Sequence, residues 1–126
     1  KILSIFKTLA GGILSYQDEN GMFNQVTNDP FSYAETSSTA MFALSFLRGY
    51  KNGWLTKEYK TAAEKAWRAL TDCCIDKDGN LYGVCRGSGF SFREEYYRDE
   101  LSWVLNDTHG IGIVLLLASE IAETEK

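Results

Sequence analysis

The chain has 126 residues, of which 44% are hydrophobic and 24% are charged, and its formal net charge is −4. This composition is that of one folded domain with a single apolar core, and it excludes a disordered tail. The acidic balance and the lack of a basic cluster exclude an electrostatic surface for nucleic acid, so we expect no nucleic-acid partner. The longest apolar run, residues 111–118, is far shorter than the roughly 20 residues of a membrane-spanning helix, so we expect no membrane partner.

Apolar residues at helical spacing predict a first amphipathic helix from residue 1 to about residue 17. A turn at residues 18–21, an extended piece at 22–26 and a break at Asp29-Pro30 follow. The chain does not begin with Met, and we interpret this as a sign that it is part of something longer.

Two helices follow this break. A hydroxyl-rich segment leads into small apolar residues and predicts a helix from residue 35 or 36 to about 51, where Asn52-Gly53 stops it. Thr56 is the predicted cap of a third helix over residues 57–74. In the third helix, apolar residues recur at helical spacing on one face and charged residues lie mostly on the other, which is typical of an outer helix with one buried face.

The segment from Asp76 to Asn80 has the aspartates of a calcium loop, but its Gly is at the fourth position, where that loop needs Gly at the sixth. It therefore predicts a turn. An extended piece at residues 81–85 and a break at 87–89 come next. The last helix, from residue 107 or 108 to about 123, is apolar nearly all round, so we expect an inner, fully covered helix.

The order of helix, Asp-rich turn, short strand, polar loop and inner helix occurs twice, over residues 1–51 and 57–123. Paired amphipathic and apolar helices at this period are typical of α/α toroids. The expected fold class is all-α: a partial α/α toroid, the arc of a six-hairpin α/α barrel, with short hairpin strands in the loops. At roughly 50 to 60 residues per unit a ring of six needs more than about 300 residues, so residues 1–126 are expected to be a portion of a barrel.

Cys73, Cys74, Cys85 and the single His109 lack the spacing of a zinc site, so we expect no metal and no cofactor. We interpret the three cysteines as reduced and structural. Reduced cysteines favour a cytoplasmic location, with the periplasm as the alternative.

Polar residues near the predicted helix starts are candidate binding groups. Glu35, Thr36 and Ser37 place hydrogen-bonding groups at the mouth of a buried helix. Glu35 has two interpretations, a general acid or base if buried, or a structural residue favoured by the helix dipole. Gln25 is neutral and suits sugar hydroxyls. His109 is either near a bound carboxylate, which the free N–H groups of a helix start would attract, or an ordinary helix-end residue.

A charged segment before the last helix has its own alternatives. Glu94-Glu95 and Asp99-Glu100 are paired carboxylates, which glycosidases use, but they alternate with arginines in a loop-like segment. This alternation favours a solvated charged face. Tyr96 and Tyr97 either stack on sugar rings or cover the rim of the barrel.

Four segments carry a resemblance to a known family. They are residues 18–26 (DENGMFNQV), 33–43 (YAETSSTAMFA), 85–89 (CRGSG) and 106–112 (NDTHGIG). In this order they resemble the C-terminal part of the unsaturated uronyl hydrolases, glycoside hydrolase families 88 and 105. The resemblance spans nearly all of the 126 residues.

The resemblance implies a six-hairpin α/α barrel that removes an unsaturated uronic acid from the non-reducing end of oligosaccharides derived from pectin or glycosaminoglycan. It implies hydration of the 4,5 double bond by an aspartic acid that acts as general acid and base, without a metal. That aspartate, the aromatic platform and an Arg-Gly-Asn-Gly-Trp-type motif lie upstream of the matched region, so the resemblance implies no catalytic residue in this chain. Phe23 stands where the family often has Trp, and Thr108 where it often has Pro.

We therefore predict the C-terminal portion of a barrel glycosidase, active only together with the missing N-terminal part of the same barrel and acting on an unsaturated oligosaccharide. One alternative is a non-catalytic helical repeat module that binds glycan or protein. Another is a different α/α-barrel sugar enzyme, an epimerase or a lyase. The assignment to a sugar cleft would be contradicted if the five predicted residues faced solvent on the outer surface or were scattered over different sides of the helices. The predicted substrate-binding or supporting residues are Gln25, Glu35, Thr36, Ser37 and His109.

Overall fold

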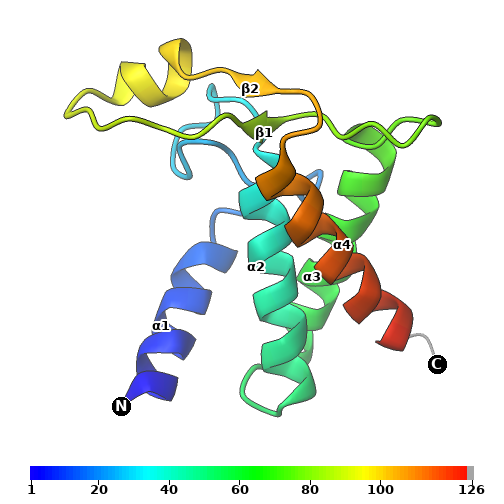
Figure 1. The fold of residues 1–126 in the computed structure, drawn as a ribbon. Coiled ribbons are helices and arrows are strands. Elements are labelled where there is room, and N and C mark those ends of the chain that lie inside the picture. Colours follow the sequence, from blue (N-terminus) through cyan, green and yellow to red (C-terminus); the bar gives the residue numbers. More distant parts are fainter. Residues whose placement is uncertain (125–126) are drawn as a thin grey trace.

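The computed structural model describes residues 1–124, which are mostly helical and carry one small two-stranded sheet. The N-terminal ends of α2 and α4 lie at the same end of the molecule, beneath the two strands (Figure 1). Among the described residues, no helix combines the length and the apolar character needed to cross a membrane. The elements are α1 (Ile2–Leu14), α2 (Thr36–Lys51), α3 (Lys57–Cys73), β1 (Val84–Cys85), the short π-helix η1 (Tyr96–Glu100), β2 (Trp103–Val104) and α4 (Thr108–Thr124).

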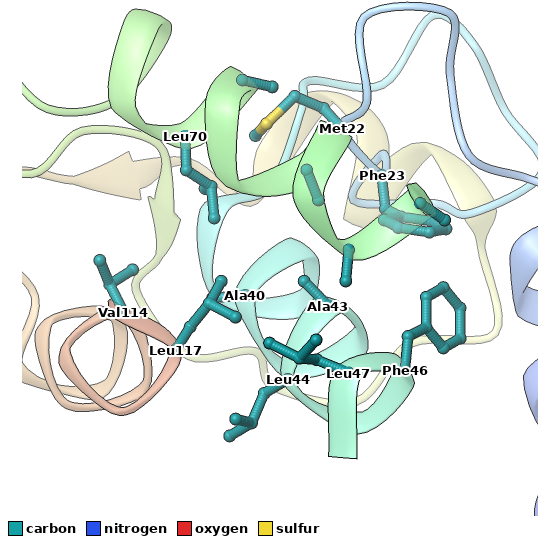
Figure 2. Close-up of a cluster of buried hydrophobic side chains, with 14 of the residues drawn as sticks. Met22, Phe23, Ala40, Ala43, Leu44, Phe46, Leu47, Leu70, Val114 and Leu117 are labelled. Carbon is teal, nitrogen blue, oxygen red and sulfur yellow. The ribbon is translucent and has the colours of Figure 1, made fainter. Parts of the chain in front are cut away.

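Helix α2 is the centre of the core, with α3 and α4 packed against it. Ala40 and Ala43 of α2 and Ala63 and Ala66 of α3 are fully buried, and their small side chains permit close approach of the two backbones. Larger apolar side chains from several elements then fill the remaining space. They include Met22, Phe23, Leu44, Phe46, Leu47, Leu70, Val114 and Leu117 (Figure 2).

The two Asp-rich turns have the same backbone hydrogen bonds, which confirms the predicted repeat at this level. Asp18 N–H donates to Met22 O over 2.9 Å, and Gly21 N–H donates to Asp18 O over 2.9 Å. In the second turn, Asp76 N–H donates to Asn80 O over 3.1 Å, and Gly79 N–H donates to Asp76 O over 3.0 Å. Both glycines have positive φ, 100° at Gly21 and 82° at Gly79, a conformation that other residues adopt at a cost.

The predicted hairpin strands in the loops are present, but they are shorter than the extended segments that predicted them. β1 pairs antiparallel with β2, with Val84 opposite Val104 and Cys85 opposite Trp103. The first extended segment forms only an isolated bridge, between Asn24 and Ala34. The sheet lies across the N-terminal ends of α2 and α4 (Figure 1).

Helix α4 is not the fully covered helix that its sequence predicts. Its buried residues are Gly110, Val114, Leu117 and Ile121, which recur every three to four positions along one side. Leu115 and Leu116, on other sides, are 64% and 52% exposed. An all-round apolar sequence allows a helix to be covered on every side, but coverage needs neighbours. Within residues 1–124, α2, α3 and β1 pack against α4 and leave Leu115 and Leu116 exposed.

Three smaller predictions at element ends also need correction. Helix α1 ends at Leu14, not near residue 17, because tighter turns follow, such as the Tyr16 N–H bond to Ile13 O. Thr56 occupies the cap position of α3, but its hydroxyl donates to Glu58 Oε1 and makes no cap bond. The segment expected to be a loop contains η1, which Leu101 N–H closes on Tyr96 O.

Candidate functional site: the polar cluster beneath the first strand

Strand β1 joins the N-terminal ends of α2 and α4. Cys85 N–H donates to Glu35 Oε1 over 2.9 Å, and Gly83 O accepts from Thr36 N–H over 2.9 Å. On the α4 side, Gly110 lies so close to Val84 that a side-chain carbon at position 110 would overlap the valine methyl groups. The first turns of α2 and α4 are therefore placed by one short strand.

The Glu35 carboxylate is 2% exposed and is occupied by four protein donors. Ser37 N–H and Cys85 N–H donate to Oε1 over 3.1 and 2.9 Å, and Ser38 N–H donates to Oε2. The Ser37 hydroxyl lies 2.9 and 3.0 Å from the two oxygens. This is the geometry of a helix N-cap, and it supports the structural interpretation of Glu35.

Thr36 and Ser37 are turned toward the protein. Thr36 is fully buried, and its Oγ1 donates to Tyr82 O over 2.6 Å. Ser37 is half-buried and bonded to Glu35. The Thr36 hydroxyl therefore holds the loop at Tyr82 on α2, whereas the Ser37 hydroxyl bonds within the helix end and Ser37 retains some exposure.

Gln25 reaches the same strand from the preceding loop. Its backbone N–H donates to Tyr33 O over 2.8 Å, and its Nε2 donates to Cys85 Sγ over 3.6 Å. Tyr33 has a buried hydroxyl that forms no hydrogen bond within residues 1–124. Burial, together with the neighbouring Cys85 thiol, raises the pKa of Tyr33 well above its usual range, so the phenol keeps its proton.

His109 lies apart from this cluster, at the start of α4. Its side chain is 80% exposed, and its Nδ1 is 2.8 Å from Asp107 Oδ1. Asp107 Oδ1 also accepts the His109 backbone N–H over 2.9 Å, and these two bonds lower the pKa of Asp107. The Asp107 carboxylate thus already accepts an N–H group at the start of α4 that the sequence predicts to be free for a sugar carboxylate.

The structure brings together four of the five predicted residues, Gln25, Glu35, Thr36 and Ser37, around β1. It also shows two members of this cluster that sequence reasoning missed, Tyr33 and Cys85. Both lie in segments that carried the family resemblance, but we interpreted Cys85 only as a structural cysteine, and no local pattern marks Tyr33. A hollow of about 520 Å³ lies elsewhere, between α3 and α4, lined in part by Lys60, Trp67 and Ile121.

The paired carboxylates form the solvated face that their alternation with arginine favoured. Arg93 pairs with Glu100 and Arg98 with Asp99, each over 2.8 Å, and Glu94 is exposed. The hydroxyls of Tyr96 and Tyr97 accept the N–H groups of Gly89 and Ser91, each over 3.0 Å. These two tyrosines therefore hold the loop at residues 89–91 against η1 by hydrogen bonds.

A family model covers nearly the whole chain. The family model described as Glycosyl Hydrolase Family 88 matches residues 1–125. An unsaturated 3S-rhamnoglycuronyl hydrolase from Formosa agariphila is 31% identical over 126 residues, covering 98% of this chain and 31% of that protein. The chain thus spans about a third of that relative.

Two solved structures, with different names, match most of this chain. A crystal structure described as a possible member of family GH105, from Salmonella enterica serovar Paratyphi A, matches with a TM-score of 0.91 and 25% identity over 98% of this chain and 32% of that one. A polysaccharide lyase matches with a TM-score of 0.75 and 27% identity over 93% of this chain and 33% of that one. With residues 1–125 matched by the family model, this chain belongs to glycoside hydrolase family 88, and its structure is similar to that of the possible member of family GH105.

Proposed function

We propose that this chain supplies one wall and part of the rim of the sugar cleft in an unsaturated uronyl hydrolase. The intact enzyme removes an unsaturated uronic acid from the non-reducing end of pectin- or glycosaminoglycan-derived oligosaccharides, by hydration of the 4,5 double bond. The observation that carries the proposal is the family match over residues 1–125. The relative from Formosa agariphila acts, by its name, on an unsaturated rhamnoglycuronyl substrate, which supports this substrate class.

The catalytic acid belongs, in this proposal, to the N-terminal part of the same barrel. The exposed apolar surface of the chain supports such a neighbour: Ile2 and Leu9 of α1 are 85% and 59% exposed, and Leu115 of α4 is 64% exposed. Burying such side chains is favourable by about 1.5–3 kcal/mol each, so further helices of a barrel would gain by covering them. We propose that this chain forms the C-terminal portion of that barrel.

Within the cleft we assign direct contact to Gln25, with Ser37 beside it. Gln25 is half-buried, and its amide has polar capacity left after its bond to Cys85. Glu35 and Thr36 support the wall through the bonds that hold β1 on α2. His109 remains a candidate for contact with the sugar carboxylate at a second point, because its ring is exposed at the start of α4.

The test is an assay of the native gene product that carries this chain, with unsaturated disaccharides from pectin and from chondroitin. Hydration of the double bond removes its ultraviolet absorbance, so we expect the absorbance to fall. Gln25→Ala should raise KM, whereas Asn28→Ala, an exposed change in the same loop, should leave KM unchanged. Constant absorbance with every unsaturated disaccharide would contradict the proposal.

A polysaccharide lyase is the second candidate, because a structure with that name matches 93% of the chain. A lyase forms an unsaturated uronide by elimination from an intact polysaccharide, whereas the proposed hydrolase consumes one. The same assay separates them by sign. Absorbance that rises with intact pectin or chondroitin would identify the lyase.

We also propose a cytoplasmic location, with the periplasm as the alternative. Cys73, Cys74 and Cys85 are free thiols in the structure, which is compatible with a reducing compartment. Fractionation of the native cells tests this location. Recovery of the protein with periplasmic markers would select the alternative.

A further inference from the structure

Cys85 contacts both Glu35 and Gln25 in the polar cluster around β1. Its backbone N–H holds Glu35 at 2.9 Å, and its Sγ accepts from Gln25 Nε2 at 3.6 Å. The Tyr33 hydroxyl is buried near the same thiol. The thiol therefore contacts the side chain to which the proposed function assigns direct sugar contact.

The bond to sulfur determines which polar atoms of Gln25 remain available. An amide side chain has two N–H donors and one carbonyl acceptor. One N–H is directed to Cys85 Sγ, while Oε1 accepts no hydrogen bond in the described part of the chain. A free carbonyl with an adjacent free N–H matches the acceptor and donor pattern of neighbouring sugar hydroxyls.

We propose that Cys85 is a positioning residue for sugar binding: its thiol orients the Gln25 amide so that Oε1 and the second N–H face the sugar hydroxyls. This inference rests on the proposed function and names the group that makes one binding residue competent. The backbone of Cys85 is fixed by Glu35 and by β2, so the thiol has a defined position. A side chain that a hydrogen bond already orients loses less conformational freedom when the sugar binds.

The experiment is a double-mutant cycle in the native gene product that carries this chain, with the unsaturated disaccharide that it hydrates. Cys85→Ala should raise KM about fivefold with kcat changed less than about twofold, because it removes a contact that orients a binding group. Gln25→Ala should raise KM at least as much. The double variant should match Gln25→Ala alone, because Cys85 acts through Gln25.

Two further variants separate positioning from general stability. Cys73→Ala changes an exposed cysteine at the end of α3 and should leave KM unchanged. Cys85→Ser retains a hydrogen-bonding atom and should recover part of the lost affinity. Additive effects of the two substitutions, or equal KM values for wild type and Cys85→Ala, would overturn the inference while the hydrolase proposal stands.

Thiol modification gives a readout that needs no variant and covers the case in which Cys85→Ala does not fold. With saturating disaccharide, alkylation of Cys85 by iodoacetamide should slow severalfold, while alkylation of the exposed Cys73 should not. Equal rates at Cys85 with and without the disaccharide would overturn the inference. If the wild-type protein neither binds nor hydrates any unsaturated disaccharide, the proposed function fails, and the inference with it.

Discussion

Cys85 and Glu35, fifty positions apart in the chain, are joined by a hydrogen bond of 2.9 Å from the cysteine N–H to the glutamate carboxylate. This bond lets one buried carboxylate cap α2 and hold β1 at the same time. The strand in turn contacts Gly110 of α4 through Val84. The first turns of α2 and α4 thus depend on the position of a two-residue strand.

Glu35→Ala should destabilise the fold by about 2–4 kcal/mol, because it removes a helix cap and leaves the partly buried N–H groups of Ser38 and Cys85 without their acceptor. Urea unfolding followed by circular dichroism measures this change. Glu19→Ala, an exposed change in the first turn, should cost less than about 0.5 kcal/mol. Equal midpoints for the two variants would contradict the structural role of Glu35.

The cluster shows what the sequence could and could not predict. The helix periods and the Asp-rich turns are local patterns, and α2 begins and ends within a residue of the prediction. The contacts of Cys85 with Gln25 and Glu35 join positions 60 and 50 apart, so no local pattern contains them. The sequence did not predict η1, because a single π-helical turn has no apolar period. It did not predict the exposure of Leu116 either, because the sequence of a helix does not show which elements pack against it.

Gly110→Ala should destabilise the chain by about 1–3 kcal/mol, because the added methyl group would overlap Val84 and force β1 away from α4. Gly112→Ala lies in the same helix, with open space around the new methyl group. There the better helix propensity of Ala should stabilise the chain by about 0.5–1 kcal/mol. Opposite shifts of the urea midpoint are expected, and a stabilising Gly110→Ala would contradict the close contact.

Asp76 should make stability depend on pH at the acid end. Bonds from the Asn80 side chain and backbone, and from Tyr82 and Asp78, lower the pKa of Asp76 to about 2. The group therefore binds its proton more readily in the unfolded chain, where its pKa is about 3.9. Its stabilising contribution is present above that value and is lost as the pH falls through about 2.

Thermal unfolding between about pH 5 and about pH 2 checks the Asp76 prediction. Asp76→Asn should show a flatter loss of stability with acid than the wild type, because the titrating group is absent. Asp78→Asn, which changes an exposed carboxylate in the same turn, is the control and should keep the wild-type slope. Parallel curves for wild type and Asp76→Asn would contradict the lowered pKa.

The two repeated turns should respond unequally to the same substitution. Gly21→Ala and Gly79→Ala both place a side chain at positive φ, which costs about 1 kcal/mol. At position 79 the new methyl group meets open space, whereas at position 21 it would lie 2.7 Å from Lys65 O in the α3 backbone. Gly21→Ala must therefore also displace the turn from α3, and we expect it to cost at least about 1 kcal/mol more than Gly79→Ala in urea unfolding. Equal losses would show that the first turn can move away from α3 freely, and that its packing on the helix does not hold the loop that carries Gln25.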